Sequence, residues 1–212
     1  GLDLRDENIF GTGTELGLIL FGGLENRAYI LEQKANRIFD TYFTYKINVF
    51  YKFNDIRTYS DVQIENSNNF SREEVGKYRQ IFYGLSLGIG SQVGRFGNLI
   101  FEGRYQFDEV KNIDNEPIDP YKTKIVSLKI STTIDTQDKY PYPENGVFFS
   151  GFYETAASVF GGEVGYSNLG FEYKNYFSIS SRSVISPKIS FGFADKTLPL
   201  SEQYSLGGQE SF

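Results

Sequence analysis

Apolar and polar residues alternate along most of the chain. In residues 43–53, FTYKINVFYKF, every odd position is apolar or aromatic, and among the even positions only Phe50 is not polar. A two-residue period predicts a β-strand with one apolar and one polar face. The apolar rows with this period are Leu16, Leu18 and Leu20; Tyr29, Leu31 and Ala35; the odd positions of 43–53; Ile81, Tyr83, Leu85, Leu87 and Ile89; Leu99, Phe101, Tyr105 and Phe107; Val126, Leu128, Ile130 and Ile134; Val147, Phe149, Tyr153, Ala157 and Val159; Leu169, Phe171, Tyr173, Phe177 and Ile179; and Ile185, Ile189, Phe191 and Phe193.

These rows predict an all-β fold, an antiparallel meander of about nine or ten long strands. Residues 57–65 are either a tenth strand or the extension of a strand into a loop. We expect tight connections at 38–42, 93–98 and 180–182, and long polar loops at 54–78 and 111–121. No stretch has a helical period and no composition shift divides the chain, so residues 1–212 are predicted to form a single domain.

Charged residues within the predicted strands lie on the face opposite the apolar rows. Acids and bases are mixed on that face, which suits a polar, water-filled interior where opposite charges pair across strands. The residues concerned are Glu15, Glu32, Lys34, Lys46, Lys52, Glu102, Arg104, Asp108, Lys129, Glu154, Glu172, Lys174 and Lys188.

The apolar rows could face either a protein core or lipid, because the strands of a soluble antiparallel sandwich also alternate. Strand length distinguishes the two. Soluble strands run to about 5 or 6 residues, whereas an 11-residue strand is roughly 36 Å long and, tilted by about 45°, covers roughly 25 Å, the height of the apolar band of an outer-membrane barrel. Phe43, Phe53 and Phe177 lie near span ends, where aromatic girdles are expected. Length therefore favours a transmembrane β-barrel, and the soluble sandwich is the alternative.

Composition removes several classes of function. The chain has no Cys and no His, which excludes disulfides, thiolate nucleophiles, Ser-His-Asp triads and the usual zinc sites. A net charge of −6 argues against nucleic acid as a partner. We predict no cofactor, no metal and no catalytic residue, so the chain itself is not expected to be an enzyme.

Three stretches resemble ligand or catalytic motifs without the required context. Gly84-Leu85-Ser86-Leu87-Gly88 matches the G-x-S-x-G nucleophile pattern, but its serine lies in mid-strand with no helix following, so small residues facing the barrel interior are predicted. Gly11-Thr12-Gly13 is followed by a strand where a phosphate loop needs a helix. The acidic stretch 108–119 lacks the spacing of a calcium-binding EF-hand and is predicted to be a solvated surface loop.

Three other stretches, in order, resemble the BamA/TamA/FhaC superfamily of bacterial outer-membrane barrels, the bacterial surface antigen barrel domain. In 134–146, a strand ends in Asp-Thr-x-Asp and is followed by aromatic-Pro-x-x-Gly. Residues 198–212 are similar to the start of the family's inward-folded loop, and residues 8–13 to a turn between early strands. The motif positions are Gly11, Gly13, Asp135, Asp138, Pro143, Gly146, Leu206, Gly207 and Gly208.

The resemblance implies a 16-stranded transmembrane barrel whose inward loop follows the eleventh strand. The chain would carry about the third to the eleventh strand and would be a partial domain, truncated at both ends. The Arg-Gly-aromatic tip of the loop would come after Phe212. Two unpaired sheet edges are not tolerated in lipid, so we expect that this piece alone is not a functional pore.

The resemblance also implies a location in the bacterial outer membrane and a role in protein insertion or translocation. Its partners would be membrane lipid, unfolded outer-membrane or secreted proteins and accessory lipoproteins, without nucleic acid. The alternative is a barrel that anchors a patatin-like phospholipase whose catalytic domain lies upstream. A passive porin is a further alternative.

Overall fold

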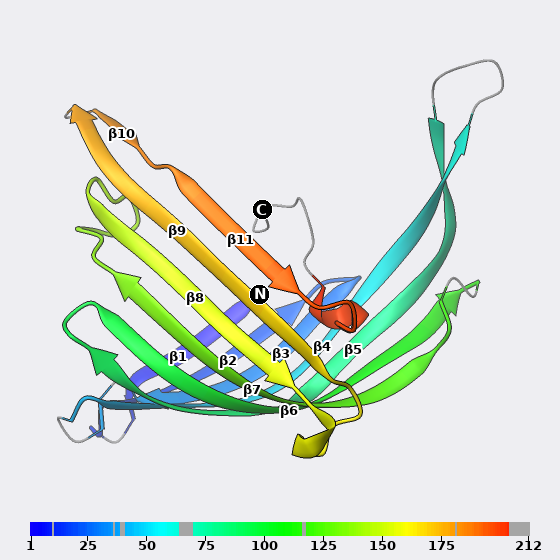
Figure 1. Ribbon diagram of the computed structural model, residues 1–212, viewed down its shortest axis with the longest axis horizontal. Coiled ribbons are helices and arrows are strands. Elements are labelled where there is room, and N and C mark those ends of the chain that lie inside the picture. The colour runs from blue at the N-terminus through cyan, green and yellow to red at the C-terminus, as the bar shows by residue number, and fades with distance from the viewer. Residues whose placement is uncertain are drawn as a thin grey trace.

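The computed structural model describes residues 1–9, 11–35, 37–38, 41–63, 70–115, 118–180 and 182–203. These residues form one antiparallel sheet of 11 strands and two short 3-10 helices, which confirms the predicted all-β meander (Figure 1). The elements are β1 (Leu2–Ile9), β2 (Thr14–Gly22), β3 (Asn26–Ala35), β4 (Phe43–Gln63), β5 (Phe70–Val93), β6 (Gly97–Asp114), β7 (Tyr121–Asp135), β8 (Gly146–Ala156), η1 (Ser158–Phe160), β9 (Tyr166–Ser180), β10 (Ser183–Ile185), β11 (Lys188–Ala194) and η2 (Leu200–Glu202).

Each strand from β1 to β9 pairs with the next, and the sheet curves into an open trough (Figure 1). We call the edge with the connections after β1, β3, β5, β7 and β9 the turn rim. The opposite edge, with the connections after β2, β4, β6, β8 and β11, is the hairpin rim. Within the described ranges no helix is long and apolar enough to cross a membrane.

The last predicted row is one strand interrupted by a proline. β10 pairs with the end of β9 and β11 pairs with its earlier part, both on the same edge. Pro187 lies between them and has no N–H to donate to a ladder, although its carbonyl accepts a hydrogen bond of 3.2 Å from the Asn175 N–H. The pairing therefore stops at residues 186–187 and resumes at Lys188.

The predicted long polar loop at 54–78 is wrong, because most of it is strand. β4 and β5 stay paired from Phe43↔Ser91 to Gln63↔Phe70, with one register shift after Thr58. Residues 57–63 therefore extend β4, which agrees with the second of the two alternatives for 57–65, an extension of a strand. Polar sequence continues the ladder here because strands that leave the membrane need no apolar row. The hairpin projects from the hairpin rim in Figure 1.

Smaller corrections concern strand ends. β6 extends to Asp114, so part of the predicted loop 111–121 is strand. β8 ends at Ala156, and Ala157 and Val159 leave the predicted row because the chain turns into η1 there. β1 adds a strand that the rows did not include.

The two faces of the sheet are inverted relative to a soluble protein. The apolar rows are exposed, for example Val49 at 50% and Leu87 at 52%, whereas Ser127, Gln106 and Glu154 on the other face are 0%, 3% and 4% exposed. A monomeric soluble protein does not leave so large an apolar surface in water. The arrangement is that of a membrane barrel, with apolar rows toward lipid and polar rows toward the lumen.

Aromatic side chains form a girdle near the hairpin rim on the apolar face. Tyr29, Tyr51, Tyr83 and Phe107 are cross-strand partners in register on β3 to β6, with successive ring centroids 6.2, 6.4 and 5.2 Å apart. Such rings are typical of the membrane–water interface.

Of the aromatic residues expected at span ends, Phe43 and Phe177 are 65% and 51% exposed. Phe53 differs, since it is only 8% exposed. The guanidinium groups of Arg79 and Arg27 lie over its ring, at 4.3 and 5.5 Å from the centroid.

The Gly84–Gly88 stretch lies in the middle of β5, as predicted. A Cβ at Gly84 would lie 2.2 Å from the Tyr105 carbonyl oxygen, and one at Gly90 would lie 2.2 Å from that of Leu99. These glycines allow close approach of β6 where the sheet curves. Ser86 is 3% exposed, and its hydroxyl accepts a hydrogen bond of 3.2 Å from Asn48.

The connection from β7 to β8 on the turn rim is held by local hydrogen bonds. The Asp138 carboxylate accepts the N–H groups of Glu144 and Asn145 at 2.9 and 3.2 Å, and these bonds hold its pKa below the usual range. Gly146 has a φ of +113°, and a Cβ there would lie 2.4 Å from the Thr136 carbonyl oxygen. Only glycine fits this position without strain.

Substituting adjacent residues of β4 tests which face meets lipid. Val49→Arg places a charge on the apolar face and is expected to cost about 2–4 kcal/mol of insertion free energy at mid-bilayer depth. Asn48→Arg, on the polar face, is the matched control and should leave insertion nearly unchanged. Urea titration of the protein in lipid vesicles measures both, and equal costs would contradict the assignment of the faces.

Replacing Gly146 tests the β7–β8 connection. Gly146→Ala is expected to destabilise the protein by about 1–3 kcal/mol, because it forces a side chain into a left-handed backbone and against Thr136. Gly22→Ala is the control, since a Cβ at Gly22 meets nothing within 4 Å. Thermal unfolding in detergent compares the two variants; a Gly146→Ala protein as stable as the control would contradict the analysis.

Acid is expected to loosen the same connection at a defined pH. Since the Asp138 pKa is lowered by folding, its carboxylate stabilises the turn fully above about pH 4, the pKa of an unfolded aspartate. That contribution is lost as the pH falls through the lower, folded pKa. NMR shifts of the Glu144 and Asn145 amides should therefore change only below about pH 4, and Asp138→Ala should abolish the transition. A titration midpoint above about pH 4 would mean that folding raises the pKa of Asp138, which would contradict this prediction.

Candidate functional site

The polar face of the sheet carries paired charges, as predicted. On β2 and β3, Glu15 lies 3.1 Å from Lys34, and Glu32 lies 3.0 Å from Lys46 of β4. Arg5 of β1 joins both carboxylates, at 2.6 Å from Glu15 and 3.4 Å from Glu32. Neighbouring strands thus neutralise each other's charge on the lumen face, which lowers the cost of partly burying it.

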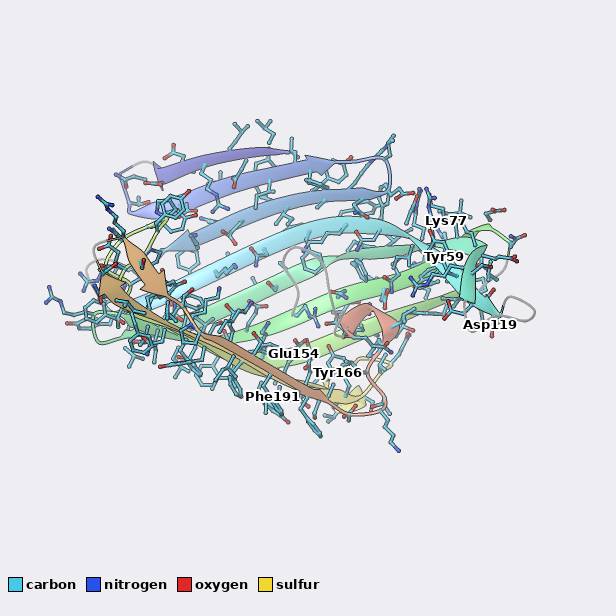
Figure 2. The ribbon with its side chains drawn as sticks, turned by 90° about the horizontal axis from the view of Figure 1, so that it is seen from above. Tyr59, Lys77, Asp119, Glu154, Tyr166 and Phe191 are labelled. Carbon is cyan, nitrogen blue, oxygen red and sulfur yellow. The ribbon has the colours of Figure 1, made fainter. Side chains whose placement is uncertain are left out.

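Arg104 on β6 is the centre of a second and more buried network. Its guanidinium lies 2.5 Å from Glu154 of β8 and 3.0 Å from Glu202 of η2, and it donates to the Tyr166 hydroxyl of β9 at 2.8 Å. The Tyr166 hydroxyl in turn donates to Glu154 at 3.1 Å. The side chains of Arg104, Glu154 and Glu202 are 17%, 5% and 14% exposed. Glu154 and Tyr166 are labelled in Figure 2.

After β11 the chain turns back at the hairpin rim and enters the trough. Asp195 fixes the turn, because its carboxylate accepts the Ser167 N–H and the Thr197 hydroxyl, both at 2.7 Å, which keeps the Asp195 pKa low. The Thr197 hydroxyl also contacts the Gly165 carbonyl at 2.7 Å. Figure 1 shows η2 on the concave side of the sheet.

Residues 195–203, which we call the returning segment, are anchored by apolar and polar contacts. Leu198 is 9% exposed and packs with Ile125, Ala156 and Tyr166. Glu202 accepts a hydrogen bond of 3.2 Å from Gln106 in addition to its ion pair with Arg104. The segment therefore rests on β6 to β9 through a small core and one buried charge.

A cavity of about 640 Å³ lies between the returning segment and the lumen face of β4 to β6. Its lining is mainly polar and includes Asn48, Lys52, Gln80 and Glu102. The lining presents side chains of both charges, among them Lys52 and Glu102.

The prediction that 108–119 is a solvated loop is wrong for its first residues. Asp108 lies within β6 and is 0% exposed, and the Tyr121 hydroxyl donates to its carboxylate at 3.3 Å. Glu109 is also in β6. The alternation that places Arg104 and Gln106 on the lumen face continues to Asp108, so the residue belongs to the interior. In the described part of the chain, no group of three acidic residues could hold a metal ion.

The motif positions that the structure describes lie in turns or at the strand ends beside them, and none of them belongs to the network around Arg104. Gly11 and Gly13 have φ values of +72° and +70° in the β1–β2 turn. Asp135, whose carboxylate accepts the Gln137 N–H at 2.9 Å, Asp138, Pro143 and Gly146 come together in the β7–β8 connection on the same rim. Leu206, Gly207 and Gly208 lie outside the described residues.

The residues that anchor the returning segment were not singled out from the sequence. Arg104 and Glu154 were placed on the lumen face, but nothing linked them to Glu202, which is 98 residues from Arg104 along the chain. Strand register gives no signal either, because Arg104 is in register with Ser127 and Ala156, whereas Glu154 is in register with Lys129 and Glu102. Tyr166, at the start of β9, gave none.

Comparison with known proteins agrees with this architecture. Residues 8–212 match the Omp85 superfamily domain. The crystal structure of BamA from Haemophilus ducreyi lacking POTRA domains 1–3 is similar in fold, with a TM-score of 0.75 and 18% identity over 99% of this chain. The chain spans 41% of that BamA chain. A search of curated proteins found no match. The chain thus belongs to the Omp85 superfamily, as a β-barrel domain of the bacterial outer membrane.

Proposed function

We propose that this chain is the barrel domain of a factor that inserts proteins into the outer membrane or moves them across it. The observation that carries the proposal is the returning segment, which enters the lumen and is held there by a buried charge. The returning segment occupies part of the lumen that a passive porin uses as its water-filled channel. Membership of the Omp85 superfamily supports the same role.

The anchor consists of a buried positive charge shared by two carboxylates. Arg104 lies between Glu154 and Glu202 at 2.5 and 3.0 Å. With Glu154 present, loss of Glu202 leaves Arg104 paired, so the sheet survives while the returning segment is released. Glu202 is therefore a positioning residue that fixes where the inward loop begins.

The substrates we propose are unfolded outer-membrane or secreted proteins, and accessory lipoproteins are proposed partners. No covalent step is needed, because an unfolded strand binds an exposed sheet edge through backbone hydrogen bonds. The lumen supplies a hydrated, charge-balanced surface past which a polar segment can move. Leu206, Gly207 and Gly208 are proposed to continue the inward loop, and the turn-rim motifs to hold strand register.

Neutralising Glu202 in the full-length protein tests the proposal. Glu202→Gln is expected to slow insertion of a reporter barrel protein into vesicles roughly tenfold, since a hydrogen bond to a charged group contributes about 1.5 kcal/mol or more. Glu172→Gln is the matched control, because Glu172 pairs with Lys174 and Lys188 at 2.7 and 3.0 Å on the same face, away from the returning segment. Protease protection of the reporter measures insertion.

Restoring the anchor by other means separates its role from folding. The chain has no cysteine, so Gln106→Cys and Glu202→Cys can be joined with a short thiol-specific cross-linker. Cross-linking should recover much of the activity that the uncoupled double variant lacks. Full activity of Glu202→Gln, or equal loss in Glu172→Gln, would contradict the proposal.

A further inference from the structure

Basic side chains border the aromatic girdle on the lipid-facing side of the hairpin rim. Tyr29, Tyr51, Tyr83 and Phe107 form one level across β3 to β6, and Lys124 of β7 continues it. The next level outward is formed, in register across β3 to β7, by Arg27, Phe53, Ile81, Glu109 and Lys122. Two residues along a strand span about 6.6 Å. These cations thus lie where the hydrocarbon ends and lipid headgroups begin.

The charge of this border is opposite to that of the chain, whose net charge is −6. At and beyond the girdle, outward positions of β3 to β7 and the β2–β3 turn carry more bases than acids. The bases are Arg27, Arg57, Arg72, Lys77, Arg79, Lys111, Lys122 and Lys124; the acids are Glu25, Asp55, Asp61, Glu74, Glu109 and Asp114. The border is therefore a local positive field on an acidic protein.

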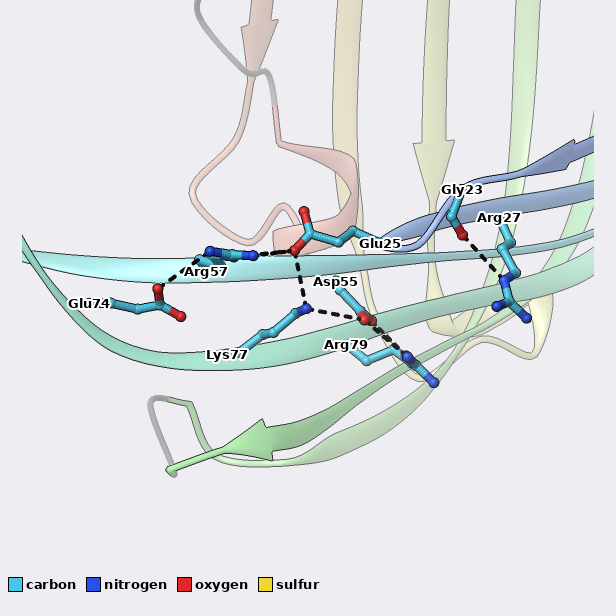
Figure 3. A network of polar contacts seen from close by, with 8 residues as sticks. All are labelled: Gly23, Glu25, Arg27, Asp55, Arg57, Glu74, Lys77 and Arg79. Carbon is cyan, nitrogen blue, oxygen red and sulfur yellow. Dashed lines mark hydrogen bonds and ion pairs between the residues drawn. The ribbon is translucent and has the colours of Figure 1, made fainter. Parts of the chain in front are cut away.

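Most of these acids are paired with bases of the same set. Figure 3 shows the pairs around Glu25, Asp55 and Glu74. Arg79 binds Asp55 with two hydrogen bonds of 2.6 and 3.0 Å. Arg57 and Lys77 lie 2.7 and 3.2 Å from Glu25. Arg57 also lies 3.6 Å from Glu74. These pairs take up the carboxylates of Glu25, Asp55 and Glu74.

Three cations remain available. Arg27, Lys122 and Lys124 form no ion pair within 4 Å in the part of the chain that the structure describes. Glu109, the cross-strand neighbour of Lys122, pairs with Lys111 at 3.0 Å. The Glu163 carboxylate accepts the main-chain N–H of Lys124 at 2.9 Å. Arg27 donates only a long 3.4 Å bond to the Gly23 carbonyl and lies over Phe53. Lys122 lies over the rings of Tyr83 and Phe107, at 5.8 and 5.4 Å from their centroids. Arg27 and Lys122 are exposed, and their ring contacts hold both side chains beside the girdle, one level outward of it.

We propose that Arg27, Lys122 and Lys124 bind the phosphate groups of anionic lipid headgroups in the leaflet at the hairpin rim. Guanidinium and ammonium groups are the usual ligands of phosphate, and they act strongly where water is partly excluded. The position of the three cations beside the girdle distinguishes a lipid phosphate from a free phosphate ion. A free phosphate ion would gain nothing from the neighbouring girdle, whereas a lipid places its chains on Leu31, Val49 and Leu85 while its headgroup reaches the cations.

Lipid retention by the full-length protein tests this site. The protein is incorporated into nanodiscs of phosphatidylcholine containing a small fraction of a bisphosphorylated lipid A, and lipids retained after mild detergent extraction are counted by mass spectrometry. The Arg27→Gln and Lys122→Gln double variant should bind this lipid about 25-fold more weakly, about fivefold for each basic residue near an anionic surface. Arg79 is left intact because Asp55 depends on it.

The matched control is Lys46→Gln, which removes a cation from the lumen face. It should retain the phosphorylated lipid as the unmodified protein does, and dephosphorylated lipid A should show no preference for any of the proteins. Equal retention by the double variant, or equal loss in the control, would overturn the proposal. Inorganic phosphate is tested as a competitor. If millimolar phosphate binds the protein on its own and displaces the lipid at the same concentration, the assignment to lipid is overturned. Retention of a normal heat-shifted barrel band confirms that the variants fold.

Discussion

Backbone hydrogen bonding in hydrocarbon is the constraint on which the whole structure depends. Lipid offers no partner to a peptide N–H or C=O, so each strand in the membrane must be paired on both sides with others. In the described residues each strand from β1 to β9 pairs with the next, with local register shifts in the β1–β2, β4–β5 and β5–β6 ladders. Pairing on the outer edge of β9 stops at Ser186–Pro187, where Pro187 has no N–H, and resumes at Lys188. Once the backbone is satisfied in this way, side chains alone decide which surface meets lipid.

The inverted distribution of side chains follows from that constraint. Lipid accepts the exposed Phe, Tyr, Leu and Val rows, and the remaining polar rows must share the interior with water and each other. Interior charges are tolerable because acids and bases alternate between strands, as in the Glu32–Lys46 pair. The same requirement gives the returning segment its anchor. Arg104 pairs with Glu154 within the sheet, and Glu202 adds a second carboxylate to it when the chain folds back into the lumen.

The sequence predicts what depends on period and on local chemistry. A strict two-residue period identified the faces of the strands, and the Asp138–Gly146 turn was visible because an aspartate, two prolines and an Asn-Gly pair are adjacent in sequence. Strand ends were not predictable by the same route. Beyond the bilayer a ladder needs no apolar row, so residues 54–63 and 70–78 are paired although their sequence resembles a loop. The contact between Arg104 and Glu202 depends on closure over four strands and a reversal after β11, and no local pattern encodes it.

Lipid contact with the odd-numbered side chains of β4 is the central claim, and site-directed spin labelling measures it most directly. Single cysteines are introduced at successive positions from 43 to 53 in the full-length protein, labelled with a nitroxide and reconstituted in vesicles. Collision rates with oxygen, which concentrates in lipid, and with a water-soluble nickel complex should both oscillate with a two-residue period and in opposite phase. Oxygen maxima should fall at Tyr45, Ile47, Val49 and Tyr51. In-phase oscillation, or low accessibility of these four positions to both reagents, would mean that protein rather than hydrocarbon covers them.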